Sequence, residues 1–252
     1  KNYADTGFVA QNKNRIQKLL NSFSASWPAA RNGLVFLWRK PSRKRKQSGD
    51  WFYDLEARGK AHIDRAGVMY VSDGSYIAPN VNKKLLKQCM ATNELTIEAI
   101  LTPDNLLQRD PTLIISFSTD DSTRNFTLGQ SSDNIILRLR TSISGARRNG
   151  HELPLFALGA LGRIHVVVVY SPGSLVCYVN GEEARKTSEV QGDFGNWTPH
   201  HFVIGDEYND PRDWDGTVEG VAIYSRALGR KEVARNFKVF FSGKKRKRRG
   251  DD

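Results

Sequence analysis

The spacing of apolar residues changes once along the chain. Residues 7–23 carry apolar side chains three or four positions apart, while lysines and arginines occupy the opposite positions. The apolar positions are Ile16, Leu19, Leu20 and Phe23. This spacing predicts an amphipathic helix, which ends before Trp27-Pro28 because the residue before a proline disfavours helical backbone. We expect the helix to dock on the body of the protein or on a neighbour.

From Gly33 onward the chain is a succession of short apolar runs separated by Gly, Asp, Asn and Ser, the pattern of strands and turns. The predicted strands cover residues 34–38, 51–53, 68–71, 76–78, 95–101, 113–117, 126–128, 135–140, 164–170, 175–179, 202–204 and 217–224. A short helix is expected around 83–90 and a closing helix after Leu228, with Val233 and Phe237 on its apolar side. Asn180-Gly181 predicts a tight hairpin, since both positions of a type I′ turn need positive φ.

About a dozen short strands with little helix between them predict an all-β fold, an antiparallel β-sandwich. We divide the chain into an N-terminal helical extension, 1–31, a β-sandwich, 32–241, and a basic tail, 242–252, which we expect to be disordered. The longest apolar run, Val166 to Tyr170, is far shorter than the roughly 18 to 20 residues of a membrane helix. The sequence therefore predicts no membrane-spanning helix.

Several motifs in this order resemble a known family. They are Gly33–Trp38, Tyr53–Leu55 with Gly59, Gly74–Ile77, Glu94–Ala99, Tyr178–Gly181, Phe202–Gly205 and Asp215–Leu228. Together they cover residues 32–241 and resemble the laminin G-like, concanavalin A-like jelly-roll domains, closest to a branch found in large exported proteins of planctomycete-type bacteria. The resemblance implies a jelly roll. It also implies a module that binds carbohydrate or protein, often with one calcium ion, although the same sandwich carries glycanases and polysaccharide lyases.

The net charge of +11 is concentrated in two tracts. One is Arg39, Lys40, Arg43, Lys44, Arg45 and Lys46, and the other is Lys244, Lys245, Arg246, Lys247, Arg248 and Arg249. Without these twelve residues, 26 Lys and Arg face 27 Asp and Glu, so the rest of the chain is nearly neutral. The tracts are candidate sites for an anionic polymer, a lipid surface or a protein partner, or else solubilising segments; specific nucleic-acid binding is not expected, because basic and aromatic residues are not interleaved over the folded elements.

The chain starts at Lys1 without a basic-then-apolar leader, so we expect a mature exported chain or an excised fragment, and favour the first. An exported protein would be extracellular, on the cell surface or periplasmic. Cys89 and Cys177 are the two cysteines. They either form one disulfide or remain as two buried thiols, and they cannot make a metal motif.

The motifs of common enzyme classes are missing from the sequence. The strand motif Glu-x-Asp-x-x-Glu of sandwich glycanases is not present, and Asp213 and Asp215, which could share a face, fit a turn or cation site better than a catalytic pair. The four residues considered for a lyase cluster are Arg138, Arg140, His165 and Tyr170. Their spacing is not diagnostic, so a non-catalytic protein is expected.

Glycan recognition needs an aromatic surface and planar hydrogen-bonding side chains. Aromatic and polar residues gather in the loops near Trp197 and Trp214, and the family-like segment Arg124–Gln130 adds two candidates. The ligand-binding candidates are Trp197, His200, Asp206, Tyr208, Trp214, Arg124 and Asn125. The alternative for each tryptophan is that it caps the core. In the His200-His201 pair, one histidine is expected to be packed and the other exposed.

Calcium is the expected cofactor. By resemblance it would lie between Asp54 and Glu219, with Asp215 in the nearby acidic loop, although Glu219-Gly220 departs from the Asp-Glu often found in relatives. The sequence thus predicts an exported, non-catalytic module that binds a polysaccharide, a glycoprotein or an anionic surface. The alternative is a structural subunit of a larger exported assembly, docked through its N-terminal helix and basic tracts.

Overall fold

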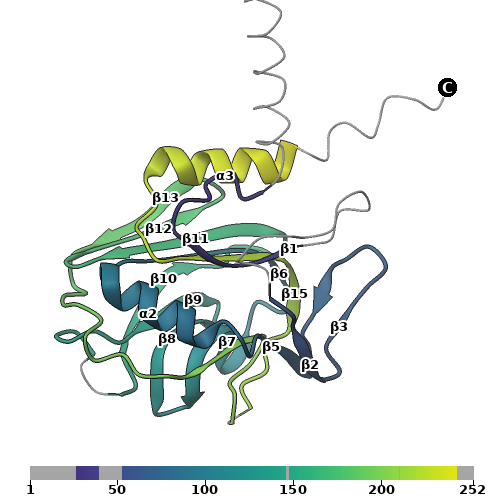
Figure 1. Cartoon of the computed structure of the whole chain (residues 1–252). Helices are drawn as coiled ribbons and strands as arrows, with labels where there is room; N and C mark the ends of the chain where they lie inside the picture. The colour runs from purple at the N-terminus through teal and green to yellow at the C-terminus, as the bar shows by residue number, and fades with distance from the viewer. Residues whose placement is uncertain (1–26, 40–52, 146–147, 210, 243–252) are drawn as a thin grey trace, which may run out of the picture.

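The computed structural model describes residues 27–39, 53–145, 148–209 and 211–242 of the chain. Two antiparallel sheets face each other (Figure 1). The first sheet follows the order β13-β12-β11-β6-β15-β4-β3, with β1 paired to β15. Its strands are β1 (Leu34–Arg39), β3 (His62–Ile63), β4 (Met69–Tyr70), β6 (Leu95–Pro103), β11 (Ile164–Ser171), β12 (Ser174–Val179), β13 (Glu182–Thr187) and β15 (Gly216–Tyr224).

The second sheet has the order β10-β9-β8-β7-β14-β5-β2. Its strands are β2 (Glu56–Gly59), β5 (Gly74–Ile77), β7 (Gln108–Asp120), β8 (Thr123–Ser132), β9 (Asn134–Leu139), β10 (His151–Ala157) and β14 (His201–Ile204). The predicted antiparallel sandwich is confirmed. The predicted hairpin is also confirmed, since φ is 53° at Asn180 and 85° at Gly181 between β12 and β13.

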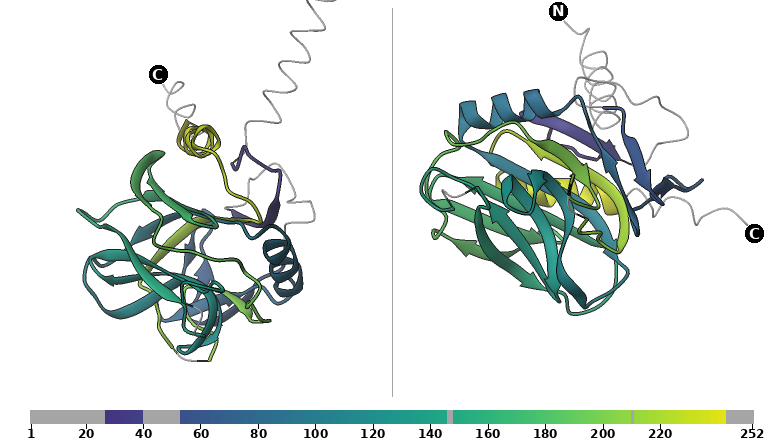
Figure 2. Two further views of the ribbon diagram at one scale, coloured as in Figure 1. Left: turned by 90° about the vertical axis from the view of Figure 1, so that its left-hand side faces the viewer. Right: turned by 90° about the horizontal axis from the view of Figure 1, so that it is seen from below.

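Each helix closes a different part of the sandwich (Figures 1 and 2). Helix α2 (Asn82–Thr92) places Leu85 and Cys89 in the core between the sheets. Helix α3 (Arg230–Ser242) lies across the outer face of the first sheet, where Val233 joins a second apolar cluster with Tyr224. Neither of these two described helices is long and apolar enough to span a membrane.

The helix α3 explains why the central strands are apolar without alternation. Along β6, Ile97 and Ala99 face the other sheet, while Glu98 and Ile100 face α3. Both faces of the strand are therefore covered, and a strand buried on both faces reads as a continuous apolar run. The same holds for β11, in which Val166 and Val168 belong to the inter-sheet core and Val167 to the α3 side.

The structure corrects some boundaries. Tyr53 is described outside any strand, whereas 51–52 lie outside the described residues. The polar strands β2, β3 and β13, and β10, were not predicted, because an exposed edge strand needs few apolar residues. Residues 27–31, assigned above to the extension, pack on the body, since Trp27 is only 4% exposed. The predicted helix 7–23 and the tail from 243 lie outside the described residues.

The two cysteines are free buried thiols. Cys89 on α2 and Cys177 on β12 both belong to the inter-sheet core. Burial raises the pKa of Cys177 to about 12 and that of Cys89 still further. Of the two expectations, the one without a disulfide is therefore confirmed.

Candidate functional site

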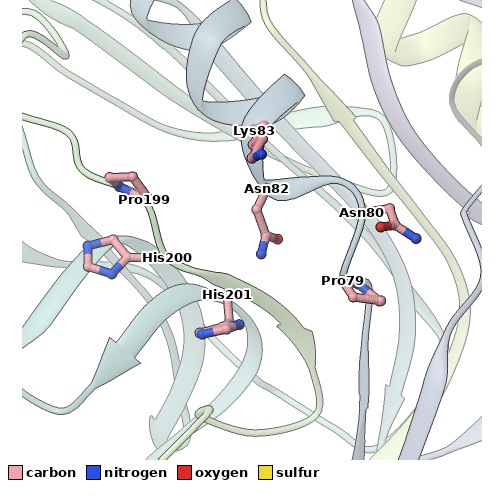
Figure 3. A pocket seen from close by; sticks show the side chains of 7 residues that line it. All are labelled: Pro79, Asn80, Asn82, Lys83, Pro199, His200 and His201. Carbon is pink, nitrogen blue, oxygen red and sulfur yellow. The ribbon is translucent and has the colours of Figure 1, made fainter.

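A pocket of about 350 Å³ opens between the start of α2 and the segment that enters β14 (Figure 3). We call it the α2–β14 pocket. It is lined by Pro79, Asn80, Asn82, Lys83, Pro199, His200 and His201. Strand pairing brings these distant segments together, because β14 pairs with β5 and the Ala78 N–H donates to the carbonyl of Phe202 at 3.0 Å. Beyond this pair the chain turns into α2 on one side and into the Pro199 segment on the other.

The beginning of α2 supplies polar groups to the pocket. No side chain caps the helix at Val81, and its first turn contains no acidic residue. The first N–H groups of a helix have no partner inside the helix, so this end carries partial positive charge. Asn82 points its amide into the pocket (Figure 3), and its Oδ1 is buried without a hydrogen-bond partner among the described residues. Lys83 is exposed beside it.

His200 is a fixed, neutral part of the wall. Its Nδ1 lies 2.8 Å from Thr119 Oγ1, and its Nε2 lies 3.0 Å from Thr198 Oγ1. Burial, helped by Arg140, lowers the pKa of His200 to about 4, so the imidazole is neutral at pH 7. Because both ring nitrogens are engaged, His200 shapes the pocket and has little capacity left for a ligand.

His201 belongs to a stack of three side chains. Its ring lies 3.4 Å from the ring of Tyr208, centroid to centroid and almost parallel. The guanidinium of Arg58 covers Tyr208 at 4.4 Å, and its Nη1 donates to the Tyr208 carbonyl at 2.9 Å. Burial and Arg58 lower the pKa of His201. The pair of histidines thus consists of one buried and one half-buried side chain, with both imidazoles kept in the neutral form at pH 7.

Four of the seven predicted ligand contacts are buried away from any ligand, which corrects the prediction. Trp197 is 4% exposed, stacks on Phe194 at 4.0 Å, and donates its indole N–H to the carbonyl of Arg140 at 2.7 Å. Trp214 is fully buried, and its indole N–H donates to Gln130 Oε1 at 2.9 Å. The alternative interpretation of each tryptophan, as part of the core, is the correct one.

The other two buried candidates brace loops. Asn125 has no exposed surface and exchanges two hydrogen bonds with the backbone of Thr198, at 2.7 and 3.2 Å. Arg124 is 1% exposed and faces Glu207 at 3.9 Å. These residues hold the pocket segment 198–200 and the loop 205–215 against the second sheet.

The loop 205–215 is acidic but internally braced. Asp206 accepts hydrogen bonds from the N–H groups of Glu207, at 2.6 Å, and Arg212, at 2.5 Å. Burial raises the pKa of Glu207 to about 7, against the opposing effects of Ser118 and Arg124. Burial and neighbouring carboxylates raise the pKa of Asp213 to about 6. Although shifted carboxyls mark functional sites elsewhere, Glu207 is only 2% exposed and cannot reach a ligand in this structure.

The structure does not bring the expected calcium ligands together. Within the described ranges, no group of three or more His, Cys, Asp or Glu side chains could hold a metal ion. Glu219 instead pairs with Arg163 at 3.2 Å, while Asp54 is exposed and Asp215 is half-buried. Arg163 therefore neutralises the carboxylate that the resemblance assigned to calcium.

The residues considered for a lyase cluster are also separated. His165 and Tyr170 lie on β11 of the first sheet, and Arg138 and Arg140 lie on or next to β9 of the second. His165 is fully buried and its Nε2 is 2.7 Å from Glu98 Oε1. The predicted anion-binding residues Arg43, Lys44, Arg45, Lys46, Lys244, Lys245, Arg246 and Lys247 lie outside the described residues.

The pocket was missed from the sequence, except for His200. In the sequence, nothing distinguishes Asn80, Asn82 and Lys83 from an ordinary helix start. The pairing of β5 with β14 places them opposite His201. The one signal available beforehand was a helix start without an acidic or hydroxyl capping residue.

Comparison with solved structures finds the same architecture at low sequence identity. Botulinum neurotoxin type C, whose cell entry depends on interaction with two ganglioside molecules, matches at a TM-score of 0.64 and 11% identity, over 82% of this chain and 51% of that one. The botulinum neurotoxin DC binding domain with rat synaptotagmin II matches at 0.62 and 11%, over 82% and 51%. The same domain with SialylT matches at 0.62 and 13%, also over 82% and 51%.

The chain therefore spans about half the length of these structures, and the likeness concerns the fold. A search of curated proteins finds no match. A family model described as the concanavalin A-like lectin/glucanases superfamily, of laminin G type, matches residues 72–234. Since this match covers more than half of the chain and agrees with the two-sheet fold, the protein belongs to the concanavalin A-like lectin/glucanases superfamily.

Proposed function

We propose that this protein is an exported, non-catalytic binding module that recognises carbohydrate on a glycosylated partner through the α2–β14 pocket. The observation that carries the proposal is the side-chain amide of Asn82, which points into a pocket also lined by Asn80, Lys83 and two neutral histidines. Amide, lysine and imidazole groups pair with sugar hydroxyls as both donors and acceptors. The solved structures with ganglioside or SialylT in their descriptions support a glycan ligand by analogy of fold.

The absence of a catalytic role is part of the proposal. Hydrolysis of a glycosidic bond needs two carboxyl groups across the scissile bond. The residues that line the pocket include no Asp or Glu. The carboxyls with raised pKa values, Glu207 and Asp213, lie in the separate braced loop. Calcium, if this protein binds it, would need ligands other than the Asp54, Asp215 and Glu219 set.

The test is a glycan array probed with the full chain, followed by calorimetry on each glycan that is retained. Asn82→Ala should lower the affinity about tenfold, because the mutation removes the amide that points into the pocket. Gln88→Ala, an amide deletion on α2 outside the pocket lining, is the matched control and should bind as the unmodified protein does. Full affinity in Asn82→Ala, or retention of no glycan, would reject the proposal.

The second candidate is a structural subunit that binds another protein. It is favoured by the botulinum neurotoxin binding domain bound to synaptotagmin II, a protein ligand on a related fold. Gentle isolation followed by native mass spectrometry tests it. A stoichiometric complex with other chains that survives Asn82→Ala would favour this candidate over glycan binding.

A further inference from the structure

The charges around the α2–β14 pocket are unbalanced. Among the described residues, Lys83 at its rim makes no ion pair, and Arg140 behind it makes none either. Arg140 is 9% exposed, and its Nε has no hydrogen-bond partner in the described part of the chain. Burying a cation without a counter-charge is costly, so the surroundings of Arg140 favour negative charge.

Arg140 is connected to the pocket through two short contacts. Its Nη1 donates to Thr198 Oγ1 at 3.3 Å, and that hydroxyl lies 3.0 Å from Nε2 of His200 in the pocket wall. After burial, the positive charge of Arg140 is the second cause that lowers the pKa of His200. The positive charge of Arg148 lowers the pKa of Arg140, and the carboxylate of Asp120 opposes the effect of Arg140 on the pKa of His200.

The polar groups at the front of the pocket favour a specific kind of ligand. Lys83 and the uncapped N–H groups at the start of α2 favour an anion. The Oδ1 of Asn82 has almost no accessible surface, so the group that Asn82 offers to a ligand is its amide N–H, a hydrogen-bond donor. A ligand that fits both groups carries a negative charge and, a few ångströms away, a hydroxyl or carbonyl oxygen that accepts a hydrogen bond.

We propose that the α2–β14 pocket selects a sugar with a single negative charge, a carboxylate or a sulfate ester, which faces Lys83 while a neighbouring oxygen of the sugar accepts a hydrogen bond from the Asn82 amide. A single charge fits because Lys83 is the one formally charged residue that lines the pocket, both histidines being neutral at pH 7. This inference rests on the proposed function, since it names the class of glycan that the same site takes.

The experiment compares matched pairs of short sugars by calorimetry on the full chain. One pair is a disaccharide ending in a uronic acid and its carboxyl-reduced counterpart; the other is a sulfated disaccharide and its unsulfated counterpart. Disaccharides are chosen because a single charge gains little from the basic tracts, whose affinity grows with the number of charges neutralised. At low salt the acidic member of at least one pair should bind about tenfold more tightly. The pair that shows the difference distinguishes carboxylate from sulfate.

Two lysine variants locate the effect. Lys83→Ala should remove the preference for the acidic member, whereas Lys87→Ala, the same change one turn farther along α2, should keep it. Amide NMR shifts on titration should be largest at Asn82 and Lys83.

Each other outcome overturns the inference in a distinguishable way. If neutral and acidic sugars bind equally and shift Asn82, the pocket binds glycans without charge selection, and only the inference fails. If acidic sugars bind and the Lys83→Ala variant keeps the preference for them, the negative charge is recognised at another site and the inference is wrong. If no sugar binds at all, the proposed function fails together with the inference.

Discussion

The outer face of the first sheet and the α2–β14 pocket both contain polar groups between a helix and a sheet, but they differ in how completely those groups are paired. Under α3, the buried Glu98 accepts hydrogen bonds from Trp27 at 2.7 Å and from Asn236 at 2.8 Å, while Tyr224 donates at 3.2 Å and His165 lies at 2.7 Å. In the pocket, the Oδ1 of Asn82 has no such partner.

The difference teaches how to separate a structural polar cluster from a binding site. The Glu98 cluster joins four segments that are far apart in sequence, and Asn236 extends it by accepting from the N–H groups of Ala29 and Ala30, both at 2.9 Å. Its polar groups serve to hold α3 and residues 27–31 on the sheet. In the pocket, Thr119 and Thr198 hold His200 in place, whereas the amide oxygen of Asn82 has no hydrogen-bond partner in the described chain, so this amide is not committed to the fold.

The largest expected effect comes from breaking the paired side. Glu98→Ala leaves the indole of Trp27 buried without an acceptor and the amide of Asn236 with only the Tyr224 hydroxyl at 3.4 Å, and should lower the free energy of unfolding by about 3 to 5 kcal/mol. Chemical denaturation measures it, with Glu182→Ala as a control at an exposed carboxylate. A loss below about 1 kcal/mol would mean that α3 is held by apolar packing alone.

Trp197→Phe tests whether the wall behind the pocket is core. The change removes the hydrogen bond to the Arg140 carbonyl and leaves a small void, so stability should fall by about 2 to 4 kcal/mol. Sugar affinity, measured by calorimetry where the variant is folded, should not change. Unchanged stability with lost affinity would instead make Trp197 a ligand contact.

Glu207 gives a pH dependence with a defined sign. Its pKa is raised from 4.5 to about 7, so between these pH values the folded protein keeps a proton that the unfolded chain releases. The Glu207 contribution to stability therefore falls as pH rises from 4.5 to 7.

Glu207→Gln, which does not titrate, should gain about 1 to 3 kcal/mol relative to the unmodified protein over that range. The lowered pKa of His200 changes stability with pH in the opposite direction, but it does so equally in both proteins and cancels in the difference between them. Unfolding curves collected from pH 4.5 to 7 measure the difference, and parallel curves would refute the raised pKa.

The smallest expected effect on stability belongs to the pocket. Asn82→Ala removes an amide whose oxygen has no partner in the described chain, so the free energy of unfolding should change by less than about 0.5 kcal/mol. Thermal denaturation checks this. A loss comparable to that of Glu98→Ala would show that Asn82 is a structural residue, and the contrast between the two regions would disappear.

The sequence alone determined the sandwich. Apolar runs such as 95–101 and 164–170, the Asn180-Gly181 turn and the closing helix after Leu228 are local signals, because period, turn chemistry and helix spacing are encoded by neighbouring residues. Edge strands such as β13 were not predicted, because an exposed strand carries no apolar alternation.

The site was decided only by tertiary structure. Trp197 and Trp214 lie in polar loops of the sequence, but the fold turns their rings into the core, where the burial of large aromatic surfaces stabilises the protein. The family resemblance assigned Glu219 to calcium, but in the folded chain its carboxylate pairs with Arg163. Asn82 and His201 are more than a hundred residues apart, and the pairing of β5 with β14 makes them neighbours. Burial and long-range pairing are properties of the folded chain, so no local pattern could reveal which polar groups would be left without a partner.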